Sequence, residues 1–205
     1  MNLTDKHKYQ LLLEISQKVR DTLDLDETMN HLLDTVKTVV DYDAAGIFIL
    51  NQDLVHKRHE QPKGKIAGIA HRGYDHIQNG QDDMLRFGKG ITGHVISTNT
   101  SMIVPDTRLD ERYVKARSQT LSEIAVPILR NKRAIGALNL ESNQLSAYDE
   151  SDLEVLQFIA DAAAISIEKA MLHQQLLEKG LLDKQLQICL LYTSDAADEE
   201  DSVDL

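Results

Sequence analysis

Few residues in this chain have the type and spacing needed for catalysis or metal binding. The single cysteine is Cys189, so the residues before it contain no disulfide, thiolate nucleophile or cysteine metal ligand. His56 and His59 form an H-x-x-H pair, but their polar surroundings favour a solvated loop over a metal site. The serine-hydrolase elbow, the zincin motif and the phosphate-binding loop are all missing from the sequence. These observations predict that the chain is not an enzyme and holds no metal.

One glycine motif matches a nucleotide-binding pattern. The stretch GKGITG places Gly88, Gly90 and Gly93 in a G-x-G-x-x-G arrangement, and Asp110 follows about 20 residues later. A dinucleotide site would need this motif in the first strand-to-helix turn of a parallel sheet. Here it lies in mid-chain, between strands that read as hairpins. We therefore interpret it as a tight turn that begins a short helix.

The elements that would position any site follow from the apolar pattern. Helical spacing predicts a helix at 1–22 and another from Asp24, which Glu27 would complete as a capping box. A hairpin is predicted from two apolar runs at 124–129 and 134–140, with a turn at Asn131–Arg133. Pro127 within the first run indicates an edge or a bulge. Further strands are predicted at 44–51, 65–74 and 101–106, and a short helix at 90–100.

The last part of the chain reads as one long helix. The pattern predicts about 40 residues, with Ser146 and Asp149 as its capping box. A coiled-coil seam with alternating three- and four-residue steps, imperfect at Gln174 and Lys184, runs through Leu156, Ala160, Ala163, Ile167, Ala170, Gln174, Leu177, Leu181, Lys184 and Ile188. Up to about Ala170 this stripe can pack on its own domain. Beyond it, the leucines predict a partner helix and hence a homodimer through the terminal helices.

Composition excludes several classes of partner. The net charge is -11, and a chain this acidic is not expected to bind nucleic acid. No apolar run approaches the roughly 20 residues of a membrane span, and the N-terminus lacks the apolar core of a signal peptide. The expected location is the cytoplasm, with no membrane partner.

Four phrases together resemble the GAF domain family of small-molecule sensor modules: LLDTVKTVVDYDAAGIFILN, GKGITGHVISTNTSMIVPDTRLDERYV, SEIAVPILRNKRAIGALNLES and YDESDLEVLQFIADAAAISIEKA. The resemblance implies an α+β fold with a six-stranded antiparallel sheet, flanked by N- and C-terminal helices and continued by a long coiled-coil exit helix. It divides the chain into a helix at 1–22, a GAF domain at 23–172, a coiled-coil linker at 173–188 and a tail at 189–205.

The family also implies a ligand site over the sheet. Its polar side chains are expected from the sheet and the irregular segment before the hairpin, and the candidates are Tyr74, His94, Arg108, Tyr113 and Glu141. His94 is equally explained as a polar rim residue. Arg108 is equally explained by a structural pair with Asp106 or Asp110. No cofactor is assigned.

The residues of this sequence argue against several subtypes of the family. Bilin-binding members attach their chromophore through a cysteine, and the free methionine sulfoxide reductase members need cysteines, so neither activity is expected. The cyclic-nucleotide signature is partly matched by Asn131, Lys132, Tyr148 and Asp152, but Leu153 stands where a glutamate is required. A cyclic nucleotide therefore stays a weak alternative.

The tail 189–205 contains six acids and no Lys or Arg, unlike the helix before it. Its CLLYTSDAADE stretch resembles the translation of a transposase adapter used in sequencing libraries, so we expect this tail to be non-native and the natural chain to be truncated. The preceding LLEKGLLDKQLQI resembles linkers that lead into SpoIIE-type serine/threonine phosphatase domains.

The expected function is a regulatory sensor and dimerisation module of a bacterial signalling protein. It would relay ligand or partner binding through its exit helix to a missing output domain. The alternatives are a ligand-free GAF scaffold for dimerisation, and the sensor of a histidine kinase or diguanylate cyclase.

Overall fold

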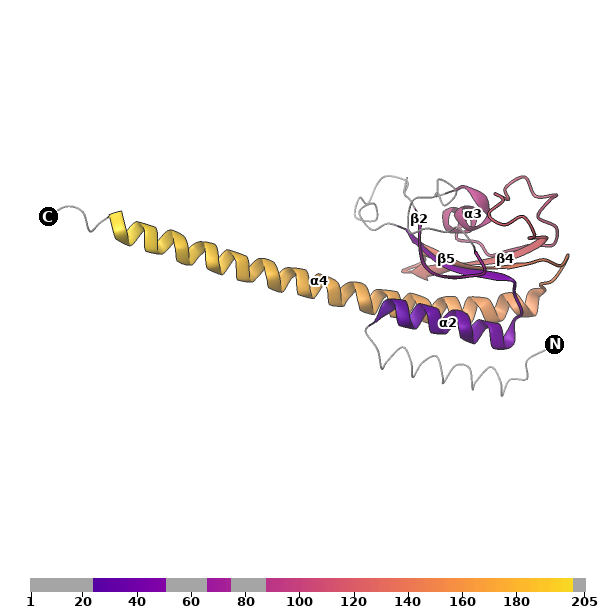
Figure 1. Ribbon diagram of the computed structural model, residues 1–205, viewed down its shortest axis with the longest axis horizontal. Coiled ribbons are helices and arrows are strands. Elements are labelled where there is room, and N and C mark those ends of the chain that lie inside the picture. Colours follow the sequence, from indigo (N-terminus) through magenta and orange to yellow (C-terminus); the bar gives the residue numbers. More distant parts are fainter. Residues whose placement is uncertain (1–23, 51–65, 75–87, 201–205) are drawn as a thin grey trace. The chain divides into compact units, whose positions relative to one another are not determined.

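The computed structural model describes residues 24–50, 66–74 and 88–200 (Figure 1). The predicted helix at 1–22 and the His56/His59 pair lie outside these ranges. In chain order the elements are α2 (Leu25–Val39), β1 (Ala44–Leu50), β2 (Ile66–Arg72), α3 (Gly90–Thr98), β3 (Met102–Val104), β4 (Ser122–Arg130), β5 (Arg133–Ser142) and α4 (Glu150–Glu200).

The strands form one antiparallel sheet in the order β2-β1-β5-β4-β3. Within the described ranges the sheet has five strands, and the expected sixth is not among them. The sixth was implied by the family resemblance alone, because the apolar runs of the sequence supply five. The antiparallel pairing around the GKGITG motif also removes the parallel strand-to-helix turn that a dinucleotide site requires.

The β4–β5 hairpin is confirmed, and its turn is tighter than predicted. Asn131 and Lys132 both have positive φ angles, 51° and 63°, which is the conformation that two-residue hairpin turns favour. Pro127 lies beyond the last β3 pairing, so β4 pairs there with β5 alone. The Pro127 carbonyl accepts a hydrogen bond from the Gln157 side-chain amide at 3.4 Å. The register irregularity falls between Ile128 and Leu129.

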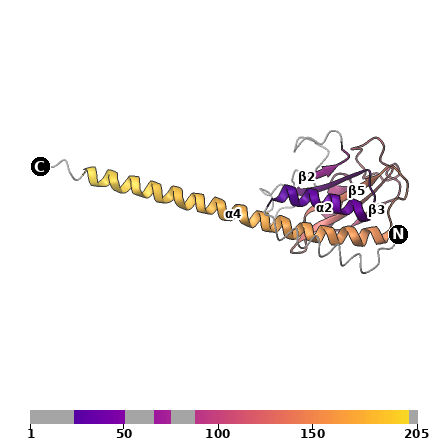
Figure 2. The ribbon, with the colours of Figure 1, turned by 60° about the horizontal axis from the view of Figure 1, so that its bottom comes forward.

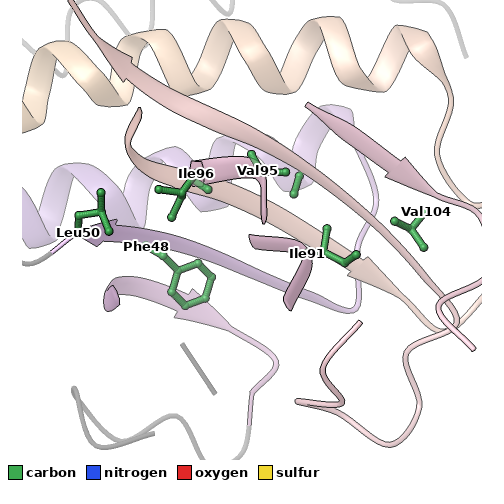
Figure 3. Close-up of a cluster of buried hydrophobic side chains, with 8 residues drawn as sticks. Phe48, Leu50, Ile91, Val95, Ile96 and Val104 are labelled. Atoms are coloured by element: carbon green, nitrogen blue, oxygen red, sulfur yellow. The ribbon is translucent and has the colours of Figure 1, made fainter. Parts of the chain in front are cut away.

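Helices cover both faces of the sheet. Helix α2 and the first part of α4 run side by side along one face (Figures 1 and 2), and α3 lies across the other (Figure 1). The α3 face carries an apolar cluster from four strands and α3 itself (Figure 3), made up of Phe48, Leu50, Ile91, Val95, Ile96, Val104, Ala125 and Ala137. Because side chains alternate along a strand, the neighbouring residues Ile124, Leu138 and Leu140 face α2 and α4, where they are fully buried.

The helix starts are only partly as predicted. Asp24 caps α2, and its carboxylate accepts the Glu27 N–H at 3.0 Å. Helix α4, in contrast, is capped by Asp149 and not by Ser146. The Asp149 carboxylate accepts the Asp152 N–H at 3.2 Å, and the Asp152 carboxylate accepts the Asp149 N–H at 3.0 Å. The first helical residue is Glu150, four residues after Ser146, so the capping box begins three residues later than predicted.

Helix α4 has 51 residues and extends to Glu200, beyond the predicted end near Ile188. The predicted seam residues Leu156, Ala160, Ala163 and Ile167 are buried within the compact unit that ends at Ile167. From Glu168 onward the helix forms a unit of its own, in which Leu172, Leu176, Leu177 and Leu181 are each more than half exposed. No helix in the described part of the chain is long and apolar enough to cross a membrane.

Candidate functional site

Three polar side chains occupy the α3 face of the central hairpin. Glu123 of β4 and Asn139 and Glu141 of β5 share the strand face of Ala125 and Ala137, so alternation turns them away from α2 and α4. Each of the three is only 3% exposed. Glu123 and Glu141 are direct cross-strand partners. Two carboxylates at opposed positions of an antiparallel pair lie close together, and like charges there are destabilising.

Hydrogen bonds join these three residues to two further side chains. The Tyr74 hydroxyl donates to Glu141 at 2.8 Å, and the Asn139 amide donates to the Tyr74 oxygen at 3.2 Å and to Glu123 at 3.1 Å. The Thr120 hydroxyl donates to the second oxygen of Glu141. We call Tyr74, Thr120, Glu123, Asn139 and Glu141 the polar cluster. Three parts of the chain meet there: the end of β2, the segment before β4, and the hairpin.

The polar cluster lacks hydrogen-bond donors. Both protons of the Asn139 amide are used, while its Oδ1 atom is buried and has no hydrogen-bond partner in the described part of the chain. The hydroxyl of Tyr113, a half-buried residue, is also without a hydrogen bond there. A buried acceptor left unpaired costs about 1–3 kcal/mol, so native proteins rarely keep one without a reason. The arrangement fits a molecule that brings donors.

Gly46 of β1 makes room beside this acceptor. A Cβ built on Gly46 would lie 2.3 Å from the Phe48 ring and 3.2 Å from Asn139 Oδ1. Because glycine has no side chain, the Phe48 ring can lie against the backbone of β1 at Gly46. Figure 3 shows Phe48 on this face of the sheet among the apolar residues.

Burial controls the electrostatics of the cluster. It raises the pKa of Glu123 well above its usual range, and the neighbouring Glu141 raises it further. Burial also raises the pKa of Glu141, although hydrogen bonds from Thr120 and Tyr74 partly oppose this effect. The pKa of Tyr113 rises to about 12 because the ring is buried and faces Glu141. The two carboxyls therefore resist ionising together.

The structure brings together three of the five predicted site residues. Tyr74 and Glu141 are hydrogen-bonded, and Tyr113 lies close enough to Glu141 for the two groups to affect each other electrostatically. Arg108 instead forms a two-pronged ion pair with Asp106 in its own loop, at 2.7 and 2.8 Å, and its side chain is 61% exposed. His94 is half-buried in α3 and lies near Asp110.

Sequence reasoning missed Thr120, Glu123 and Asn139. The signal was present for two of them. In GALNLES, Asn139 and Glu141 alternate with Leu138 and Leu140, and in SEIAVPI Glu123 directly precedes an apolar run within the same strand. A polar side chain at a buried strand position needs partners, and two such strands joined by a short turn place these positions side by side. Thr120 lies in an irregular segment and gave no comparable signal.

The residues weighed for other ligands have structural roles. Asn131 and Lys132 form the hairpin turn, and Asp152 takes part in the capping box of α4. Among the described residues there is no group of three His, Cys, Asp or Glu side chains that could hold a metal ion.

Comparison with known proteins finds both enzymes and regulators. A free methionine-R-sulfoxide reductase of Saccharomyces cerevisiae is 33% identical over 78 residues, which cover 38% of this chain and 43% of the yeast protein. A formate hydrogenlyase transcriptional activator of Salmonella typhimurium is 20% identical over 193 residues, covering 90% of this chain and 27% of the activator. The chain spans less than half the length of the curated relatives it matches.

The fold is shared with a solved reductase. The structure of free methionine-R-sulfoxide reductase from Neisseria meningitidis with its substrate superposes with a TM-score of 0.68 and 20% identity, over 83% of this chain and 95% of that one. These findings correct the prediction that the chain is not an enzyme. That prediction relied on missing catalytic motifs, and proteins of similar sequence and fold are enzymes.

The family itself is settled by the extent of the match. A family model described as GAF domain matches residues 22–168, which include every described strand and the helices on both faces of the sheet. GAF domains occur in signalling proteins such as the transcriptional activator above. The chain belongs to the GAF domain family.

Proposed function

We propose that this protein is a regulatory GAF module that binds a small polar molecule at the polar cluster. One observation carries the proposal: the Oδ1 atom of Asn139 is buried and unpartnered, in a residue whose Nδ2 donates to the buried carboxyl of Glu123. A scaffold without a ligand would be more stable with apolar residues at these positions. A polar molecule rich in donors would instead satisfy the acceptors.

Ligand binding can be tested by thermal unfolding of the full chain against a library of small metabolites. A ligand present at about 100 times its Kd stabilises the folded protein by about 2.7 kcal/mol. Replacement of Asn139 by Ala should abolish this stabilisation, whereas Arg108→Ala should not, because Arg108 pairs within its own loop. Stabilisation that survives Asn139→Ala and disappears in Arg108→Ala would contradict the proposed site.

The output of the module is part of the same proposal. Occupancy of the cluster would change the packing of the hairpin and be relayed through α4, whose exposed leucines would pair with those of a second copy. The output domain would be a serine/threonine phosphatase, as the likeness of residues 176–188 to phosphatase linkers suggests. Residues 189–205 would then be foreign to the natural chain. The genomic reading frame downstream of Gln187 tests both statements.

A second candidate function is reduction of a free sulfoxide amino acid, which the reductases among the relatives favour. One protein thiolate would take up the sulfoxide oxygen as a sulfenic acid and release the sulfide, and two equivalents of an added thiol would return it to the thiol with formation of a disulfide and water. The assay is loss of free methionine-R-sulfoxide in the presence of dithiothreitol. Turnover that disappears in Cys189→Ser would establish this activity and assign the thiolate to Cys189.

A further inference from the structure

The turn of the β4–β5 hairpin carries a concentration of positive charge. Arg130, Lys132 and Arg133 lie within four residues, and the hairpin contains no Asp or Glu between Glu123 and Glu141. Lys132 and Arg133 are exposed, and Arg130 is partly exposed. We call these three residues the basic tip. The whole chain has a formal net charge of -11, so the basic tip differs in sign from the protein that carries it.

The basic tip departs twice from what a stable hairpin favours. Arg130 and Arg133 are direct cross-strand partners, and like charges at such positions are destabilising. Lys132 has a φ of 63°, a conformation in which a two-residue turn favours glycine because a Cβ is strained there. Both departures add positive charge at a cost to the hairpin. Conflicts of this kind with local preference are expected mainly at functional surfaces.

The charge of the basic tip is not used within the described part of the chain. Lys132 and Arg133 form no ion pair with any residue of that part. By contrast, the guanidinium groups of Arg72, Arg108 and Arg112 each lie within 2.9 Å of an aspartate oxygen. Arginines with a structural role in this fold therefore have an acid beside them, and the exposed cations of the basic tip remain available to a partner.

The two arginines lie on the side of the sheet that carries α4. Ala134 packs against the apolar cluster on the α3 face, so alternation turns its neighbour Arg133, together with the opposed Arg130, toward the other face. Helix α4 begins beyond the end of β5 and runs back along that face, where the Gln157 side chain donates to the Pro127 carbonyl at 3.4 Å. A segment bound to the basic tip would lie on the same side of the sheet as α4.

We propose that the basic tip is a docking surface for an acidic segment of a partner protein. Guanidinium groups bind carboxylates through two parallel hydrogen bonds, and a few carboxylates at close spacing match three cations on one short turn. A nucleic-acid duplex or an anionic membrane presents its charge over a much larger area and would also meet the acidic surface of the chain, which repels it. The proposal shares no residue with the polar cluster and is independent of the ligand proposed there.

The test uses a fluorescein-labelled hexaglutamate peptide as the probe and hexaglutamine as its neutral counterpart. Fluorescence anisotropy follows the binding of each peptide to the full chain at low and at high salt. Hexaglutamate should bind, and its affinity should fall as salt is added, because the contacts are between exposed charges. Hexaglutamine should not bind. A single-stranded oligonucleotide and vesicles of phosphatidylglycerol serve as the other anionic probes.

Two matched variants identify the surface. Lys132→Gly removes one charge and gives the turn its favoured Asn-Gly sequence, so it should weaken hexaglutamate binding about two- to fivefold while raising the urea midpoint. Binding and stability thus change in opposite directions, which a misfolded variant cannot imitate. Lys115→Gln removes an exposed lysine from the segment before β4, and it should leave the affinity for hexaglutamate unchanged.

The outcomes decide between the possible partners. Equal affinities of the wild type and Lys132→Gly for hexaglutamate would refute the proposal, and so would an equal loss of affinity in Lys115→Gln, which would indicate attraction by charge at large. Oligonucleotide or vesicle binding that depends on Lys132, without hexaglutamate binding, would replace the protein partner by a nucleic acid or a membrane. Self-association that depends on Lys132, again without hexaglutamate binding, would assign the basic tip to a second copy of the chain.

Discussion

Replacing Glu123 by Gln should change how the stability of the protein depends on pH. Burial and the opposed Glu141 hold the pKa of Glu123 well above its ordinary value of 4.5. The folded protein therefore binds one more proton than the unfolded chain at every pH between these two values. Stability falls as the pH rises through this window, because the unfolded state gives up the proton more easily.

The size of the effect follows from linkage. One extra bound proton corresponds to about 1.4 kcal/mol of unfolding free energy per pH unit. The wild type should thus lose stability at this rate for as long as the pH lies between 4.5 and the raised pKa of Glu123. Glu123→Gln has no proton to lose at this position, so it should lack this contribution and become more stable than the wild type toward neutral pH.

The assay is urea unfolding of both proteins at pH 5, 6 and 7, with the free energy extrapolated to zero denaturant. Glu111→Gln, an exposed substitution, serves as the control and should reproduce the slope of the wild type. If the slopes of the wild type and of Glu123→Gln coincide, Glu123 is ionised in the folded protein. The argument from its burial would then be refuted.

Four further predictions concern packing, hydrogen bonding and assembly. Gly46→Ala should destabilise the fold by about 1–3 kcal/mol in urea unfolding, because the new Cβ would meet the Phe48 ring at 2.3 Å, whereas Gly180→Ala, with nothing within 4 Å, should stabilise its helix by up to about 1 kcal/mol. Tyr74→Phe removes a buried hydroxyl that both donates and accepts, and it should cost about 1–3 kcal/mol by the same method. Leu177→Lys should weaken the proposed dimer at least about tenfold in sedimentation equilibrium, and an unchanged association would exclude Leu177 from the interface.

The sequence was sufficient for the elements of the fold, because each one has a local signature. The β4–β5 hairpin could be predicted from two apolar runs around a polar turn, and the start of α2 from Asp24 and Glu27. The start of α4 was misplaced because Ser146 and Asp149 fit the capping-box spacing as well as Asp149 and Asp152 do. Only the backbone conformation distinguishes the two choices.

The candidate site was harder to predict because it depends on contacts between distant segments. Tyr74 and Glu141 are 67 residues apart in the chain, and no local pattern joins them. Arg108 was a natural candidate for an anion, yet a partner two residues away satisfies it. Glu123 was overlooked because a single acid beside an apolar run normally marks the end of a strand. Its significance emerges only with the pairing register, which places it opposite Glu141.

That register also determines how the site can influence the helices. Glu123 pairs with Glu141, and the next pair along the same two strands is Ile124 with Leu140. The first pair belongs to the polar cluster, while the second faces α2 and α4 and is fully buried. A ligand that alters the spacing of the two glutamates must therefore shift the adjoining apolar pair, because the backbone between them is shared. Close-packed interiors transmit such displacements. On each strand, a step of one residue leads from the polar cluster to a side chain that faces α2 and α4.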